Sequence, residues 1–319
     1  MTATGLPIPL GHGIFALDSG YIRPDFDAIH LIVEAGRAAI VDTGTRHSLG
    51  RVMTALSSLG LEPQDVDYVI LTHVHLDHAG GAGALMAELP EARLLVHPRG
   101  ARHMIDPARL WQATCEVYGS DQAERMYGGI VPVAAQRVIE AGDGSVIQLA
   151  GRALCFYDAP GHARHHVVIR DQDTGWIFTG DTFGISYREF DVEGRAFAFP
   201  SSTPVQFDPE ALISTIERLM ALRPEAMLLT HYSIVRDPER LATTLCRLTR
   251  RYAEIGLAHA DAGAQRSEKI QSDLQQLLLG ELRAHGTALP DERIIELLAL
   301  DLPLNADGIV SWLDARSPQ

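Results

Sequence analysis

Three histidines and one aspartate stand within six positions of each other. They are His73, His75, Asp77 and His78, and they follow an apolar run that ends at Leu71. Neutral imidazole and carboxylate groups are good ligands for zinc-like divalent cations. If the backbone stays extended, the i, i+2 spacing points His73 and His75 to the same side. The chain has begun to turn at Asp77 and His78, so their side chains can reach a second metal position beside the first. The spacing therefore predicts metal binding on a loop between a strand and a helix.

Three further candidates follow apolar runs or stand at turns. They are His162 in an Ala-Pro-Gly-His sequence, Asp181 in Thr-Gly-Asp-Thr, and His231 in Leu-Thr-His-Tyr. A single histidine after a strand is usually structural. Several strand ends that meet at one sheet edge, however, can deliver ligands to a preformed metal site. Together with the dense cluster at 73–78, these residues indicate such a site.

The elements that must position these residues alternate along the chain. Apolar strands are expected at 29–33, 38–41, 66–71, 93–96, 145–149, 152–157, 166–170, 176–179 and 226–230, with helices between several of them. This alternation is typical of a layered α/β domain. Residues 99–135 lack strand signals and predict a helical insertion. After Pro238 the periodicity is helical. We therefore predict a catalytic domain over 1–236 and a helical C-terminal region over 237–319.

These motifs resemble those of the metallo-β-lactamase-fold hydrolases. The family's His-x-His-x-Asp-His signature matches residues 73–78, and Asp42 in Val-Asp-Thr-Gly matches its first motif. Its later motifs match, in the expected order, Gly161-His162, Gly180-Asp181 and Thr230-His231. The resemblance covers about residues 8–235. It implies a four-layer αββα sandwich with metals at one sheet edge, here followed by appended helices.

The resemblance also implies a ligand set and a mechanism. It implies that His73, His75 and His162 bind one metal ion. Asp77, His78 and His231 would bind the second, and Asp181 would bridge both. We expect two divalent metal ions per chain, with zinc first and iron or manganese next. A hydroxide between the metals would be the nucleophile, because two nearby cations lower the pKa of bound water toward neutrality. Asp77 would also orient this nucleophile.

Other residues near the motifs are candidates for supporting roles. Asp42 would hold a ligand or the loop, or is a turn aspartate before Gly44. His166 would support a ligand, face substrate or pack within its strand. Five aromatic residues either line a substrate pocket or pack the core: Phe183, Tyr187, Phe197, Phe199 and Tyr232.

Composition excludes several partners. The chain of 319 residues carries 27 Lys and Arg against 41 Asp and Glu, a formal net charge of −14. This acidity repels phosphate backbones and anionic lipid, so we expect neither nucleic acid nor membrane as a partner. No apolar run approaches the ~18–20 residues that span a bilayer. The three cysteines are an odd number without metal-finger spacing, which favours reduced thiols and a cytoplasmic location.

The expected substrate is a small ester or thioester. True zinc β-lactamases generally lack a bridging aspartate, so Asp181 argues against them. Gly184 stands where quorum-signal lactonases usually have a tyrosine. The layout is similar to glyoxalase II and to PqsE-type thioesterases, which also carry C-terminal helices. A lactonase or phosphodiesterase on the same site, and a non-catalytic regulator that retains the metal site, are the alternatives.

The helical C-terminal region carries two further expectations. Arg247, Arg250 and Arg251 either imitate the basic glutathione contacts of glyoxalase II or form a solvated helix face. With the insertion at 99–135, the C-terminal helices would frame a pocket over the metals. They also offer faces on which two copies could form a homodimer.

Overall fold

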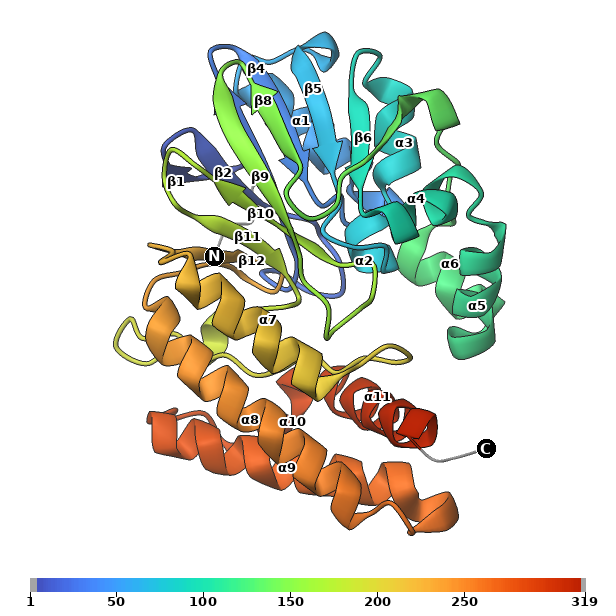
Figure 1. Cartoon of the computed structure of the whole chain (residues 1–319), viewed down its shortest axis with the longest axis vertical. Coiled ribbons are helices and arrows are strands. Elements are labelled where there is room, and N and C mark those ends of the chain that lie inside the picture. Colours follow the sequence, from blue (N-terminus) through green and yellow to red (C-terminus); the bar gives the residue numbers. More distant parts are fainter. Residues whose placement is uncertain (1–4, 317–319) are drawn as a thin grey trace. The chain divides into compact units, whose positions relative to one another are not determined.

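The computed structural model describes residues 5–316 and contains two β-sheets with helices (Figure 1). Contacts divide the chain into two compact units, which are described separately below. The first unit contains Met1–Asp158, His165–Gly180 and Glu225–Ile234. The second contains Ala159–Arg164, Asp181–Pro224 and Val235–Gln319.

The first sheet has its strands in sequence order. They are β1 (Ile8–Gly11), β2 (Ile14–Asp18), β3 (Ala28–Glu34), β4 (Arg37–Val41), β5 (Val66–Ile70), β6 (Arg93–Val96) and β7 (Val138–Glu140). Pairing is antiparallel from β1 to β4 and parallel from β4 to β7. The strands predicted at 29–33 and 38–41 are confirmed, and they form a hairpin. Its two turn residues, Ala35 and Gly36, both have positive φ, as a tight right-twisted hairpin requires.

Alternation along these strands builds two cores. In β4, Ala38 and Ile40 face a core shared with helices α1 (Leu49–Ser58) and α3 (Ala82–Glu88). Ala39 and Val41 point the other way, into a core shared with the second sheet. Successive side chains of a strand point to opposite faces, so apolar residues at every position bury both faces of the sheet.

The second sheet has the order β13-β12-β11-β10-β9-β8. Its strands are β8 (Val146–Leu149), β9 (Arg152–Asp158), β10 (Val167–Asp171), β11 (Ile177–Gly180), β12 (Met227–Leu229) and β13 (Ser233–Val235). Strand β11 is parallel to β12, so the chain leaves both strands at the same edge. The two sheets with their helices confirm the predicted α/β sandwich.

Three helices confirm the helical character of the predicted insertion at 99–135. They are α4 (Pro98–Ile105), α5 (Ala108–Tyr118) and α6 (Ser120–Tyr127). In the described part of the chain, no helix combines the length and apolar character needed to cross a membrane.

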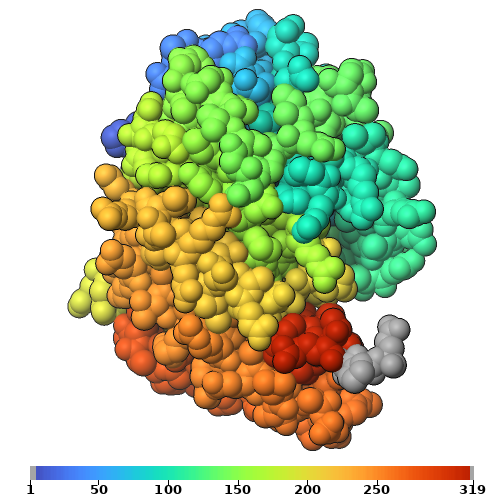
Figure 2. All heavy atoms as spheres, viewed as in Figure 1, coloured from blue at the N-terminus to red at the C-terminus, as the bar shows by residue number. Residues whose placement is uncertain are grey.

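The second unit is built mainly of helices. Helix α7 (Pro209–Ala221) begins after Asp208, whose carboxylate accepts a hydrogen bond from the Ala211 N–H at 3.0 Å. Helices α8 (Pro238–Ala258), α9 (Arg266–His285), α10 (Asp291–Leu297) and α11 (Asp301–Arg316) confirm the predicted helical C-terminal region. Figure 2 shows α8 and α9, in orange, as one continuous surface. Since this unit also takes in residues 159–164 and 181–224, the domain boundary near residue 236 stays a prediction.

Candidate metal centre

The loop after β5 brings three imidazoles together in the first unit. The backbone is extended at His75 and then enters the short helix α2 (Leu76–Ala79). The Nε2 atom of His73 lies 2.9 Å from Nδ1 of His75, and the rings of His73 and His78 are 4.0 Å apart. His73 and His78 are fully buried, whereas His75 and Asp77 are partly exposed. The loop therefore presents one open side, next to His75 and Asp77.

Asp42 ties this loop to the neighbouring strands. Its carboxylate, 1% exposed, accepts hydrogen bonds from the backbone N–H of Thr72, from Nδ1 of His78 and from the hydroxyl of Thr230, each at 2.8 Å. A proton held on Nδ1 leaves the lone pair of His78 on Nε2, so Nε2 is the atom that could bind a metal ion. Asp42 makes the contacts required for the supporting role predicted from the sequence.

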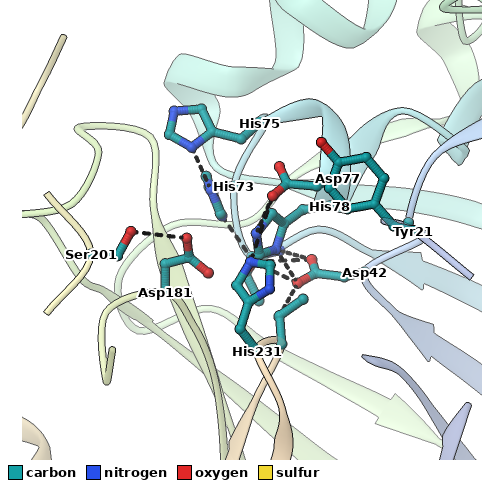
Figure 3. A network of polar contacts seen from close by, with 12 residues as sticks. Tyr21, Asp42, His73, His75, Asp77, His78, Asp181, Ser201 and His231 are labelled. Atoms are coloured by element: carbon teal, nitrogen blue, oxygen red, sulfur yellow. Dashed lines mark hydrogen bonds and ion pairs between the residues drawn. The ribbon is translucent and has the colours of Figure 1, made fainter. Parts of the chain in front are cut away.

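His231 joins the same cluster from the end of β12. Its Nδ1 donates to the carbonyl oxygen of Phe26 at 2.9 Å, which again leaves the lone pair on Nε2, free to face a metal ion. Oδ2 of Asp77 lies 3.6 Å from Nε2 of His231 and 3.9 Å from Nε2 of His78. Ligand atoms of these three residues all lie within 4.8 Å of one another (Figure 3). Two imidazoles and a carboxylate at this spacing fit a divalent cation.

Two further residues near this cluster were missed by the sequence reasoning. Asp27 is fully buried, and burial raises the pKa of its carboxyl group to about 7, while His231 and His78 lower it. Tyr21 lies beside Asp77 (Figure 3). Neither belongs to a spaced motif, so only the position of its loop between β2 and β3 could have pointed to it.

The second unit holds a separate histidine–aspartate pair. Nδ1 of His162 donates to the carbonyl oxygen of Ser201 at 3.2 Å, and its Nε2 lies 3.5 Å from Oδ2 of Asp181. The side chains of His162 and Asp181 are buried. Gly161 makes this turn possible, because its φ is +128° and an added Cβ would lie 2.3 Å from Cα of Leu212. His162 is thus held in the same way as His78 and His231.

The remaining predicted residues have varied surroundings. His166 is 1% exposed and stacks on His73 with ring centroids 4.7 Å apart. In the second unit, Phe183 and Tyr187 are fully buried, and the Tyr187 hydroxyl donates to the carboxylate of Asp301 at 3.0 Å. Tyr232 is 5% exposed. Contact of any of these side chains with substrate stays a prediction.

Comparison with known proteins assigns the chain to a family. The family model described as metallo-beta-lactamase superfamily matches residues 23–231. The chain belongs to this superfamily. The match includes both histidine–aspartate groups, and the superfamily's members are mostly hydrolases that bind divalent metal ions.

Several relatives in the superfamily resemble this chain. A metallo-beta-lactamase fold-containing protein of Sulfurisphaera tokodaii is 24% identical over 228 residues, 70% of this chain and 79% of the relative. A hydroxyacylglutathione hydrolase of Stenotrophomonas maltophilia is 30% identical over 48% of this chain and 44% of its own length. An acyl-coenzyme A thioesterase of Gallus gallus is 29% identical over 54% of this chain and 64% of its own length. The matched segments thus span less than two thirds of both named hydrolases.

A solved structure extends the likeness in fold. A metallo-beta-lactamase family protein from Thermus thermophilus superposes with a TM-score of 0.69 at 22% identity. The alignment covers 96% of this chain and 95% of that one. The likeness therefore includes the C-terminal helices as well as the two sheets.

Proposed function

We propose that this chain is a binuclear metal-dependent hydrolase that cleaves a small ester or thioester. The observation that carries the proposal is the orientation of three histidines. Nδ1 of His78, His162 and His231 faces an oxygen acceptor in each case. Fixing Nδ1 in this way selects the tautomer and aims Nε2, as metal-ligating histidines require. Histidines that only pack a core have no need for this shared arrangement.

The proposal retains the ligand assignment implied by the sequence motifs. Seven residues act as ligands of two divalent metal ions: His73, His75, Asp77, His78, His162, Asp181 and His231. Support comes from the family match over residues 23–231 and from the separate anchoring seen within each unit. Zinc is the first candidate for the metal, with iron or manganese next, because carboxylates are harder ligands than imidazoles.

The chain's own residues have distinct tasks in this reaction. When bound, the metal ions activate water at neutral pH and polarise the scissile carbonyl group. Asp77 is 23% exposed at its side chain, so it can reach the attacking water, orient it and accept its proton. Asp42 is buried beneath His78 and holds that ring, so it acts on the reaction only through its neighbour.

Names of the relatives support the substrate class. Two of them are a hydroxyacylglutathione hydrolase and an acyl-coenzyme A thioesterase, and thioester cleavage is common to both names. An acidic chain with 41 Asp and Glu against 27 Lys and Arg favours a small molecule over nucleic acid as the substrate. A cytoplasmic location and a homodimer are also part of this proposal.

Elemental analysis and a substrate panel test the function together. We expect a metal-replete preparation to hold about two equivalents of metal per chain and to hydrolyse acyl thioesters faster than lactones or bis-(p-nitrophenyl) phosphate. His231→Ala should lower the metal content. The matched control His259→Ala, at an exposed ion pair with Asp273, should not. At most one equivalent would refute the binuclear site, and activity on the phosphodiester alone would refute ester cleavage.

A further inference from the structure

The loop at residues 200–203 touches both members of the histidine–aspartate pair in the second unit. The carbonyl oxygen of Ser201 accepts the hydrogen bond from Nδ1 of His162 at 3.2 Å. The hydroxyl of the same serine lies 3.5 Å from Oδ2 of Asp181 (Figure 3). Ser201 is 1% exposed. One buried serine therefore contacts both residues, and the position of its backbone decides where Nε2 of His162 points.

Asn305 of α11 fixes the peptide groups on both sides of this serine. Its Oδ1 accepts a hydrogen bond from the N–H of Ser202 at 2.7 Å, and its Nδ2 donates to the carbonyl oxygen of Pro200 at 3.5 Å. The hydroxyl of Ser202 lies 3.1 Å from both the amide oxygen and the backbone oxygen of Asn305. Asn305 is 1% exposed, so the loop is held by these bonds rather than by water.

The peptide group between Ser201 and Ser202 links His162 to Asn305. Its carbonyl oxygen accepts from His162, while its N–H donates to Asn305. A peptide group is planar and rigid, so a displacement of its N–H end also moves its carbonyl end. Hydrogen bonds in such a chain also polarise one another, so the bond to Asn305 strengthens the bond to His162. Asn305 thus acts on the His162 ring through a single rigid group.

The face of α11 that carries Asn305 is shaped for this contact. Asp301, Asn305 and Gly308 stand at i, i+4 and i+7, on one side of the helix, and all three are buried. An added Cβ at Gly308 would lie 1.4 Å from the carbonyl oxygen of Ser202, so only glycine lets the loop approach this closely. Glycine and buried polar residues are unfavourable inside a helix unless a partner requires them. For Asn305 and Gly308 that partner is the loop.

We propose that Asn305 and Gly308 are positioning residues of the metal centre. They hold Ser201 in place, and Ser201 in turn orients His162 and Asp181. The inference rests on the hydrolase function proposed above, because that proposal makes His162 and Asp181 metal ligands. Partners that orient a ligand typically change metal affinity by about 10–100-fold. The C-terminal helix α11 then contributes to metal binding.

The zinc affinity of the full-length protein tests the inference without a substrate. We would titrate Zn²⁺ in competition with a chromogenic chelator and record the visible spectrum of the Co²⁺-loaded protein, which depends on ligand number and geometry. Asn305→Ala should raise the Kd of one of the two metal ions by about tenfold and change the Co²⁺ spectrum. Asn305→Asp keeps an oxygen acceptor for the Ser202 N–H and should stay within about threefold of the wild type.

Two controls separate this effect from a loss of stability. Tyr187→Phe removes a buried hydrogen bond to Asp301 of the same helix but leaves the Ser201–Ser202 peptide group in place. It should lower stability without changing zinc affinity. Gly308→Ala should weaken zinc binding as Asn305→Ala does, because its methyl group displaces the loop. Its control is Gly280→Ala in α9, where an added Cβ meets nothing within 4 Å.

The remaining outcomes also decide the inference. Unchanged zinc affinity and Co²⁺ spectrum in Asn305→Ala, or an equal loss of affinity in Tyr187→Phe, would overturn it and leave α11 a structural role alone. Should Asn305→Ala fail to fold, Asn305→Ser serves in its place, because its shorter side chain loses the bond but keeps a polar group there. A wild type that binds two zinc ions and cleaves no thioester would contradict the proposed function, and the zinc affinities would still decide the inference.

Discussion

Buried polar groups serve different ends in the two units. In the first, Asp42 accepts hydrogen bonds from Thr72, His78 and Thr230, and beyond it the ligand atoms of Asp77, His78 and His231 crowd within 4.8 Å. In the second unit, His162 and Asp181 also place a ring nitrogen near a carboxylate oxygen. Other buried polar groups there link one element to another, as Tyr187 does with Asp301 of α11.

The comparison separates binding from stability. Crowding several ligand atoms in one buried place gains nothing without a cation, because lone pairs and a carboxylate do not stabilise each other. A phenol that donates to a carboxylate is satisfied within the protein itself. Substitutions of Asp77, His78 or His231 should therefore change turnover. Substitutions of Tyr187 or Asp301 should change stability.

The largest effect is expected at Asp77. Asp77→Asn can still coordinate a metal through its amide oxygen but cannot accept a proton from water. We expect kcat to fall about 10²–10⁴-fold, with metal content close to that of the wild type. Asp181→Asn should instead lose part of its metal, because in the proposed site two coordination spheres would each exchange a charged ligand for a neutral amide. Steady-state kinetics and elemental analysis of both variants separate these roles.

A matched control for Asp77 is Asp121→Asn, the same change at an exposed position in the first turn of α6. Its kcat should equal that of the wild type. Near-normal turnover in Asp77→Asn, or both metals and full rate in Asp181→Asn, would show that the assigned roles are wrong.

A smaller effect, on stability, is expected at Tyr187. Tyr187→Phe removes the donor to the buried carboxylate of Asp301, 6% exposed. We expect the free energy of unfolding to fall by about 1–3 kcal/mol, measured by urea denaturation. Tyr68→Phe, which removes an exposed hydrogen bond, should cost much less. A large rise in KM at unchanged stability would instead support the contact with substrate that the sequence suggests for Tyr187.

The third effect concerns pH and the core behind the first cluster. Burial lowers the pKa of His30 from 6.5 to about 4, against a smaller opposing influence of Asp42. Between these values the unfolded chain binds a proton that the folded chain rejects. Stability should therefore fall as the pH drops from 6.5 toward 4, by at most about 1.4 kcal/mol per pH unit.

His30→Leu should flatten this slope. Nε2 of His30 has no hydrogen-bond partner among residues 5–316, and its ring packs against Phe178, so an apolar replacement suits the site. We would compare the unfolding free energies of both metal-loaded proteins from pH 5 to 7. Ligand protonation affects the two alike and cancels in the difference. Parallel curves would contradict the assignment to His30.

The spacing of the motif predicted the histidine cluster. It did not predict which residues of distant segments lie around that cluster. A strand followed by His-x-His-x-Asp-His defines a loop locally, and residues 73–78 of the structure form it. Two buried tyrosines have remote partners instead. Tyr21 meets Tyr127 across 106 positions, and Tyr187 meets Asp301 across 114. Such pairs depend on how loops and helices return to each other, which apolar periodicity does not encode.

The aromatic residues also show that position in the sequence does not predict which side chains lie at the site. Phe183, Tyr187 and Tyr232 were singled out because they stand near motif residues in the sequence. All three are buried in the structure. Tyr21 stands far from any motif, yet it lies beside Asp77 (Figure 3). Neighbourhood in sequence is thus a poor guide to the lining of a site when distant loops supply part of it.

The smallest effect is expected on α8. Arg247 donates two hydrogen bonds to Glu281 of α9, at 2.5 and 2.6 Å, and half of its side chain is exposed. Arg251 pairs with Glu254 and Arg250 approaches Glu217, so all three arginines have partners within the second unit. This pattern favours the solvated helix face over glutathione contacts.

Since exposed ion pairs contribute about 0–1 kcal/mol, Arg247→Ala should lower the free energy of unfolding by no more than that in urea denaturation. It should also leave kcat/KM for a glutathione thioester within about twofold of the wild type, because an exposed pair of this kind can be lost without moving the backbone. A loss specific to the glutathione thioester, and absent with the N-acetylcysteamine thioester of the same acyl group, would show that Arg247 contacts glutathione after all.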